Sequence, residues 1–217
     1  MLWEGPERRV GGLGILPHTT EPDQIRRMYK VNEIFYSLQG EGFWTGTPMV
    51  FLRFSGCNLL CPFCDTDHSG YREMSAEEIV AEVSRVGGVC GRVCVTGGEP
   101  SLQLDAALVE ALHEAGFMIH VETNGTRVLP EGIDWVTVSP KRDVEGLKGN
   151  GTVVLEKADE VKVVYLGKDV EEWAEFPAAW HYLQPCSCAN TAETVAYIQA
   201  HPRWRLSLQT HKYLNIR

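Results

Sequence analysis

The chain has 217 residues, of which 44% are hydrophobic and 23% charged, as in a soluble domain with a substantial core. Lys and Arg number 20 against 29 Asp and Glu, so the formal net charge is −9 and a broad nucleic-acid-binding face is not expected. No run of 18 apolar residues predicts a membrane span, and the first 29 residues lack the apolar core of a signal peptide. We therefore expect a cytoplasmic protein with reduced thiols.

The predicted elements begin after an irregular start. Glycines and prolines such as Gly11, Gly14 and Pro17 break any periodicity there, which predicts an N-terminal extension over residues 1–30 and one ordered catalytic domain over 31–217. Short apolar runs within that domain predict strands at 49–54, 93–96, 118–121, 135–138, 161–165, 182–183 and 205–208.

Helices are predicted between several of these strands. Ser75 and Glu78 form a capping box that opens a helix continuing to Val86. A second helix runs over 104–115 and is closed by Gly116. A second capping box at 190–193 opens a helix that reaches about residue 200.

Alternating strands and helices indicate a parallel α/β sheet. The segment after 121 is too short and too rich in Gly and Pro for a helical crossover, and 142–159 is Gly-rich and weakly periodic. The sequence therefore predicts six parallel strands with fewer than six full helices, a truncated, open (β/α)6-type partial barrel. In such folds the ligand lies at the carboxyl ends of the strands.

The seven cysteines are an odd number, which in a reducing compartment points to metal binding or reactive thiols rather than disulfides. Cys90 and Cys94 flank the strand at 93–96 and are interpreted as small core residues. The remaining pair, Cys186-x-Cys188, follows a predicted strand, and its residues alone leave two interpretations open: loop thiols near the site, or no role.

Three cysteines follow the first parallel strand as C-x3-C-x2-C: Cys57, Cys61 and Cys64. Soft thiolates suit an iron–sulfur cluster, and three ligands to a four-iron cluster leave one iron open for a substrate or cofactor. A structural zinc ion is the alternative, with His68 or the Cys186-x-Cys188 pair completing the tetrahedron.

The triplet, followed by Gly97-Gly98-Glu99-Pro100 after the next strand, resembles the radical S-adenosylmethionine (SAM) superfamily. This resemblance implies a radical SAM partial barrel in which the open iron of a [4Fe–4S] cluster binds SAM. It also implies that Phe63 contacts the adenine and that the Gly98–Glu99 loop meets the SAM amino group, since glycines allow close backbone approach.

A narrower resemblance covers most of 31–217. Six segments are similar to the 7-carboxy-7-deazaguanine synthase family: 34–42 (IFYSLQGEG), Arg53 in FLRFSGC, 64–66 (CDT), 121–125 (VETNG), 138–141 (VSPK) and 208–212 (LQTHK). It implies a lyase of queuosine and related 7-deazapurine biosynthesis, which converts 6-carboxy-5,6,7,8-tetrahydropterin into 7-carboxy-7-deazaguanine with loss of ammonia. It further implies Mg2+, a homodimer and an electron donor such as flavodoxin or ferredoxin.

The resemblance assigns roles by position. Gln can match the donors and acceptors of a pterin edge, Arg fits a carboxylate, and a Thr hydroxyl is a hard ligand for Mg2+. Substrate contacts are expected from Leu38, Gln39, Gly40, Arg53, Thr96 and Arg217, and the Mg2+ ligand is Thr66. SAM contacts are expected from Phe63, Gly98, Glu99, Glu122, Asn124, Ser139, Pro140, Lys141, Gln184, Pro185 and Cys186. No side chain is assigned to acid–base catalysis.

Two alternatives remain at this point. A glycyl-radical-enzyme activase would act on a large protein partner, although the QGEG segment, Arg53 and Thr66 argue against it. A zinc-binding interaction module would have no catalytic activity.

Overall fold

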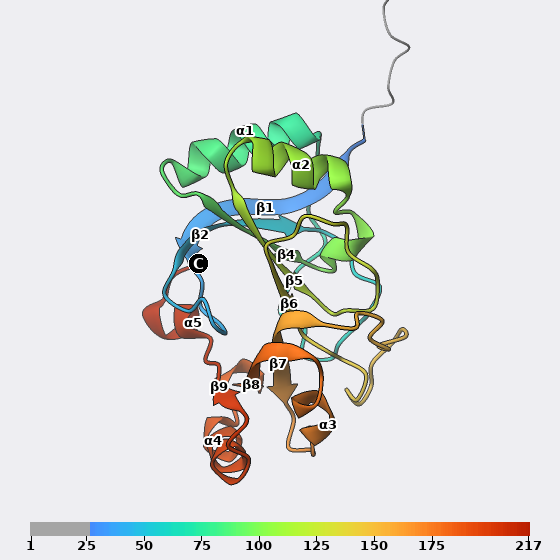
Figure 1. The fold of residues 1–217 in the computed structure, drawn as a ribbon, viewed down its shortest axis with the longest axis vertical. Coiled ribbons are helices and arrows are strands. Elements are labelled where there is room, and N and C mark those ends of the chain that lie inside the picture. The colour runs from blue at the N-terminus through green and yellow to red at the C-terminus, as the bar shows by residue number, and fades with distance from the viewer. Residues whose placement is uncertain (1–26) are drawn as a thin grey trace, which may run out of the picture.

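A nine-stranded sheet in the order β3-β1-β2-β4-β5-β6-β7-β8-β9 organises the computed structural model, which describes residues 27–217 (Figure 1). The strands are β1 (Tyr29–Leu38), β2 (Pro48–Phe54), β3 (Arg72–Met74), β4 (Arg92–Gly97), β5 (Met118–Thr123), β6 (Trp135–Val138), β7 (Ala158–Tyr165), β8 (Ala178–Pro185) and β9 (Arg205–Leu206). The helices are α1 (Ala76–Gly87), α2 (Ala106–Glu114), α3 (Glu171–Ala174), α4 (Thr191–Ala200) and α5 (Thr210–Leu214), with short 3-10 turns at Pro100–Leu102 and Cys186–Cys188.

The predicted parallel strands are confirmed, and their order along the sheet follows the chain. Strands β2 and β4 to β8 are parallel neighbours, and β9 adds a seventh parallel strand. The sheet does not close on itself, because β3 and β9 are its two edges. Helices α1 and α2 form full crossovers, whereas no helix lies between β5 and β7. The open partial barrel with fewer than six full helices is therefore confirmed.

Strand β1 was missed by the sequence analysis. It pairs antiparallel with β2, and its mixed sequence YKVNEIFYSL hides the alternation because a bulge shifts the register between Val31 and Glu33. Tyr29 and Lys30 belong to this strand although the predicted extension over 1–30 included them. Residues 1–26 of that extension lie outside the described residues.

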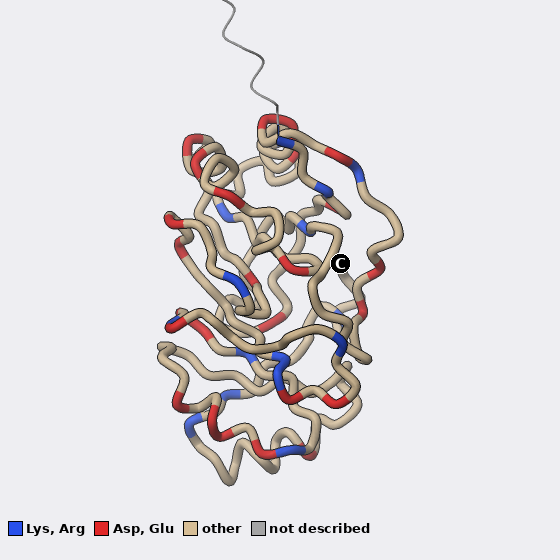
Figure 2. The backbone as a smooth tube through the Cα atoms, turned by 90° about the vertical axis from the view of Figure 1, so that its right-hand side faces the viewer, with Lys and Arg blue, Asp and Glu red and all other residues tan. Residues whose placement is uncertain are grey.

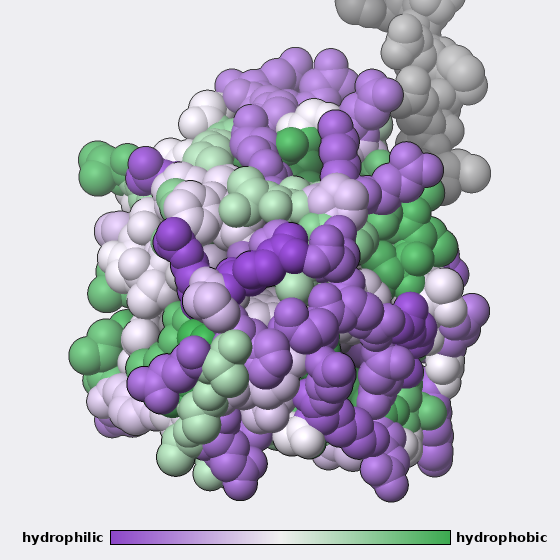
Figure 3. Space-filling view, turned by 60° about the horizontal axis from the view of Figure 1, so that its bottom comes forward, coloured by the Kyte–Doolittle hydropathy of each residue, from purple (hydrophilic) through white to green (hydrophobic). Residues whose placement is uncertain are grey.

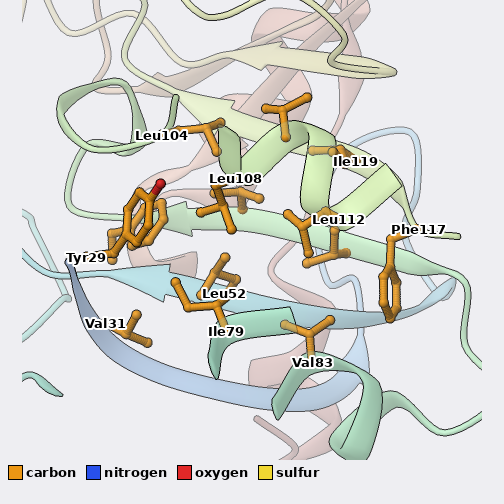
Figure 4. Packing of buried hydrophobic residues seen from close by; sticks show 14 of the residues in the cluster. Tyr29, Val31, Leu52, Ile79, Val83, Leu104, Leu108, Leu112, Phe117 and Ile119 are labelled. Carbon is orange, nitrogen blue, oxygen red and sulfur yellow. The ribbon is translucent and has the colours of Figure 1, made fainter. Parts of the chain in front are cut away.

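Helices α1 and α2 pack against one face of the sheet (Figure 4). The capping box is confirmed: the Ser75 hydroxyl accepts a hydrogen bond from the Glu78 backbone N–H, and the Glu78 carboxylate accepts one from the Ser75 backbone N–H. Ile79 of α1 and Leu108 and Leu112 of α2 are fully buried. Burying one such side chain stabilises the fold by roughly 1.5–3 kcal/mol. This packing fixes the carboxyl ends of β2, β4 and β5.

The predicted end of α2 is confirmed, whereas the predicted start of α4 is wrong in its capping. Gly116, with φ of +85°, follows the end of α2 as predicted. The capping box predicted at 190–193 is wrong, because the Asn190 side chain makes no cap. It instead accepts a hydrogen bond from the Cys186 N–H (2.9 Å) and donates one to the Tyr165 carbonyl (3.0 Å). Asn190 thus ties the loop after β8 to the end of β7.

The β1–β2 loop bridges the open side of the barrel. The backbone N–H of Gly42 donates to the Ser207 hydroxyl (2.9 Å), and that of Phe43 donates to the Glu160 carboxylate (3.0 Å). A Cβ at Gly42, where φ is +62°, would lie 2.0 Å from the Glu160 side chain, so only glycine fits. The loop therefore places residues 39–41 against β7, β8 and the segment after β9.

The surface agrees with the acidic composition. Lys and Arg are interspersed with Asp and Glu along the backbone, without an extended basic stripe (Figure 2). The face in Figure 3 is largely hydrophilic, with smaller apolar patches towards its edges. In the described part of the chain, no helix combines the length and apolarity that a membrane crossing requires.

Candidate active site

A cavity of about 300 Å³ lies where the parallel strands end. It collects residues that follow β2, β4, β5, β6 and β8, as parallel α/β architecture predicts. The predicted residues that line it are Leu38, Gln39, Gly40, Arg53, Cys57, Cys61, Phe63, Cys64, Thr66, Thr96, Gly98, Glu122, Asn124, Ser139, Lys141, Gln184, Pro185, Cys186 and Arg217. Glu99 and Pro140 are buried outside its wall.

The three cysteines of the loop after β2 all face this cavity. The loop is fastened by two backbone hydrogen bonds between Leu60 and Lys148. Burial raises the pKa of the Cys57 thiol, and the nearby Cys61 and Cys64 thiols add to the rise. The raised pKa favours the neutral thiol. A metal centre would reverse this preference, since a coordinated thiol is deprotonated.

Among the described residues, only Cys94, His120 and Glu122 bring three potential ligand atoms within 4.8 Å of one another. The three loop thiols do not form such a group, although all three line the cavity.

Cys94, His120 and Glu122 nevertheless make a poor cation site. The ammonium group of Lys162 lies 3.0 Å from Oε1 of Glu122, and the Thr96 hydroxyl donates to Oε2 (3.1 Å). This buried positive charge opposes a second cation. Burial lowers the pKa of His120 to about 4, so its ring is neutral, and Cys94 is a buried core residue as predicted. Cys90, also expected in the core, is only half-buried.

The part of the cavity where SAM contacts were predicted is braced by Glu99. Its fully buried carboxylate accepts hydrogen bonds from the Ser101 N–H (2.9 Å), the Thr123 hydroxyl (2.6 Å) and the Asn124 N–H (2.7 Å). These bonds join the Gly97–Pro100 loop to the end of β5. The structure thus gives the Glu99 side chain a bracing position, and its contact with SAM stays a prediction.

Two further groups frame the cysteine loop. The Asn124 side chain donates to the Asn58 side chain (3.0 Å), linking β5 to the loop. Lys141 donates to the carbonyl (2.7 Å) and hydroxyl (2.6 Å) of Ser139. Burial lowers the pKa of Lys141 to about 8, although the nearby Cys61 acts in the opposite direction.

A second part of the cavity rim holds two arginines, Arg53 and Arg217, which share one glutamate partner, Glu33. Nε of Arg53 lies 2.9 Å from Oε1 of Glu33, and the same carboxylate pairs with Arg217, whose guanidinium lies over the Phe35 ring. Thr66 is half-buried between this rim and the cysteine loop. Both carboxylate oxygens of the adjacent Asp67 accept hydrogen bonds from Ser69.

Two charged residues line the cavity although the sequence analysis gave them no role, Glu41 and Lys162. Together with Glu122 they form what we call the floor of the cavity. Lys162 is 6% exposed and pairs with both Glu41 and Glu122. Glu41 belongs to the QGEG segment, and Lys162 is a charged residue inside the buried strand EVKVV. A charged residue inside an apolar strand is unusual, and this signal could have found Lys162. His211, from the LQTHK segment, also lines the cavity.

An open parallel α/β barrel with a three-cysteine loop after its first parallel strand defines the radical SAM class. A model of the radical SAM superfamily matches residues 51–158. A 7-carboxy-7-deazaguanine synthase of Bacteroides thetaiotaomicron is 57% identical over 190 residues, covering 88% of this chain and all of the relative. The chain belongs to the 7-carboxy-7-deazaguanine synthase family.

Further similarities agree with this family. The Escherichia coli 7-carboxy-7-deazaguanine synthase is 36% identical, covering 87% of this chain and 99% of the relative. The crystal structure of QueE from Escherichia coli superposes with a TM-score of 0.69 and 32% identity, covering 83% of this chain and 93% of that one.

Proposed function

We propose that this protein is a lyase that converts 6-carboxy-5,6,7,8-tetrahydropterin into 7-carboxy-7-deazaguanine with loss of ammonia, for queuosine or a related 7-deazapurine. The observation that carries the proposal is the joining of two half-sites in one cavity. The cysteine loop and the SAM-side residues form one half, and Gln39, Arg53 and Thr96 form the other. The family relatives support the same activity.

The cofactor half-site comprises Cys57, Cys61 and Cys64 for a [4Fe–4S] cluster. When bound, the cluster and SAM supply one-electron hydrogen-abstraction chemistry, which protein side chains cannot provide. The chain's own residues hold the SAM-side loops through Glu99 and place Asn124, Ser139 and Lys141 on the wall. Their burial keeps water from the reacting groups.

The substrate half-site is matched to a carboxylated pterin. The free edge of the Arg53 guanidinium can hold the substrate carboxylate, because Glu33 engages Nε. The Thr66 hydroxyl would be the protein ligand of Mg2+, an ion that usually takes few protein ligands and keeps waters and substrate oxygens. Leu38, Gln39 and Gly40 approach the pterin from the loop that closes the barrel.

The proposal includes a homodimer in the cytoplasm and a flavodoxin or ferredoxin as electron donor, as the family resemblance implies. Analytical ultracentrifugation of the reconstituted protein checks the dimer. A reduction assay with each purified donor in place of a chemical reductant checks the electron source.

The decisive experiment is anaerobic reconstitution with iron and sulfide, followed by incubation with SAM, Mg2+, a reductant and the carboxytetrahydropterin. The expected products are 7-carboxy-7-deazaguanine and ammonia in equal amounts. A brown protein that cleaves SAM but yields no deazaguanine would favour the activase alternative. A colourless protein with one bound zinc ion would favour the interaction module.

A further inference from the structure

The floor of the cavity holds two carboxylates and one ammonium group in direct contact. Lys162 projects from β7 and pairs with Glu41 of the β1–β2 loop and with Glu122 of β5. The three groups come from distant parts of the chain and meet only because the loop closes the open barrel. All three line the cavity.

Each carboxylate is held by two further donors besides Lys162. Oε1 of Glu41 accepts hydrogen bonds from the side-chain amides of Gln184 (3.2 Å) and Gln209 (2.9 Å). Glu122 accepts from the amide of Gln39 (3.4 Å) and from the hydroxyl of Thr96 (3.1 Å). An ionised carboxylate offers about four acceptor sites, so one site on each remains for a ligand.

Two ionised carboxylates this close together would ordinarily share a proton, because like charges disfavour a second ionisation. Burial by itself favours the neutral forms, but the charges of Glu122 and Glu41 raise the pKa of Lys162, and Lys162 lowers that of Glu122. The ammonium group thus donates to both carboxylates and favours the ionised form of Glu122. The floor then carries one net negative charge and presents acceptors to donor groups.

We propose that Lys162 is a positioning residue for pterin recognition: it holds Glu41 and Glu122 side by side as two charged acceptors for the N–H donors of the aminopyrimidinone edge. The inference rests on the proposed function and extends it to the floor of the same site. Arg53, on another part of the cavity wall, then takes the carboxylate end. A pterin is oriented by charge at both ends.

The test compares Lys162→Met with Lys162→Arg, and with Lys168→Met as the matched control. Lys168 also pairs with a glutamate, Glu145, but on the surface, at 55% exposure. In each reconstituted holoenzyme we would measure cluster content, SAM cleavage without pterin, and kcat and KM for the carboxytetrahydropterin. Cluster content and pterin-independent SAM cleavage report whether the SAM half-site is intact.

For Lys162→Met we expect intact SAM cleavage and a rise in KM of roughly 10- to 100-fold. Without the ammonium group the two carboxylates no longer hold the position that accepts the pterin N–H groups, which weakens pterin binding by about 1–3 kcal/mol. Lys162→Arg should keep kcat/KM within about tenfold of the wild type because Arg can still donate to both carboxylates. Lys168→Met should match the wild type. A KM for Lys162→Met within threefold of the wild type, or a loss confined to kcat, would overturn the proposal.

The pH profile of kcat/KM gives a second readout that a merely structural lysine would not move. Without the cation the pKa of the buried Glu122 rises, so the acid limb of Lys162→Met should shift to higher pH than in the wild type. The other titratable or charged groups facing the pair are Cys94 on β4, His120 on β5, Glu160 on β7, Arg53 on β2 and Lys141 after β6. These groups are present in every variant, so the difference between the wild-type and Lys162→Met pH profiles reports the effect of Lys162 alone.

If Lys162→Met fails to take up the cluster, the double variant Glu122→Gln/Lys162→Met restores the charge balance of the floor. It should fold, show a raised KM and lack the shifted acid limb. A KM near that of the wild type would contradict the proposal. A wild-type protein that makes no deazaguanine would instead contradict the proposed function, whatever Lys162 does.

Discussion

The Thr123 hydroxyl donates a 2.6 Å hydrogen bond to Oε1 of Glu99, joining the end of β5 to the loop after β4 beneath the cavity. Glu99 is fully buried, and both its oxygens accept hydrogen bonds. One carboxylate therefore fixes the relative position of two loops that line the cavity.

Replacing Glu99 by Gln should weaken this brace. The Gln amide has one acceptor oxygen, so its NH2 group must face at least one of the three donors, and an unsatisfied buried group costs about 1–3 kcal/mol. We expect a lower melting temperature and weaker SAM binding, measured by thermal denaturation and by calorimetry with the reconstituted protein. Glu110→Gln, on the exposed side of α2, is the control and should change neither quantity. Unchanged SAM affinity in Glu99→Gln would exclude a bracing role.

Gly98 should not tolerate a side chain. A Cβ there would lie 2.0 Å from the carbonyl oxygen of Gly56, next to the first cysteine, so the backbone must move. A displacement of about 1 Å can cost roughly 100-fold in rate. We expect Gly98→Ala to lose about that factor in deazaguanine formation, measured by chromatography. Gly70→Ala, in open space, should be as active as the wild type, and equal activity of the two variants would refute the steric argument.

Cys57→Ala should abolish stable cluster binding. Two thiolates cannot hold a four-iron cluster as three do, so iron content and the brown colour should fall to background after reconstitution. Cys90→Ala should retain both, because Cys90 lies in the turn before β4 and contacts only backbone carbonyls. Iron and sulfide analysis with visible spectroscopy distinguishes the two. Full iron loading of Cys57→Ala would remove Cys57 from the ligand set.

Thr66→Ala should alter the response to Mg2+ while leaving the cluster intact. Loss of one oxygen ligand worth about 1.4 kcal/mol raises the half-saturating Mg2+ concentration about tenfold. A titration of the steady-state rate with Mg2+ measures the change. Ser69→Ala removes a hydroxyl in the same loop that bonds only Asp67 and faces away from the cavity, and it should leave the titration unchanged. Identical titrations for both variants would argue against a Thr66 ligand.

Glu160 should make stability depend on pH. Burial raises its pKa from 4.5 to about 7, so between these values the folded state holds a proton that the unfolded state has lost. By linkage the free energy of unfolding then falls as pH rises through this window, by an amount on the order of 3 kcal/mol. Glu160→Gln should have nearly the wild-type melting temperature at about pH 4.5 and exceed it at about pH 7.5.

The control for this effect is Glu145→Gln, whose side chain is 89% exposed. It should track the wild type at every pH. A constant difference between Glu160→Gln and the wild type across the range would show that the carboxyl group does not titrate within it.

The sequence by itself determined the parallel strands, the cysteine loop and the residues that follow each strand. Alternation and capping signals are local, as at Ser75 and Glu78, and parallel topology brings strand ends together without further information. In a motif such as C-x3-C-x2-C, the short spacing alone places three thiolates in one loop, where they can bind one metal centre. Arg53 was assigned through the resemblance of the FLRFSGC segment to a known family.

Only the tertiary structure decided what the polar side chains do. The contacts of Lys162 with Glu41 and Glu122 join residues far apart in the chain, and they depend on a loop that closes the barrel. The burial of Glu99 likewise follows from how two strand ends meet. Burial and charge neighbours determine protonation and hydrogen bonding, and both arise from packing that no local pattern encodes.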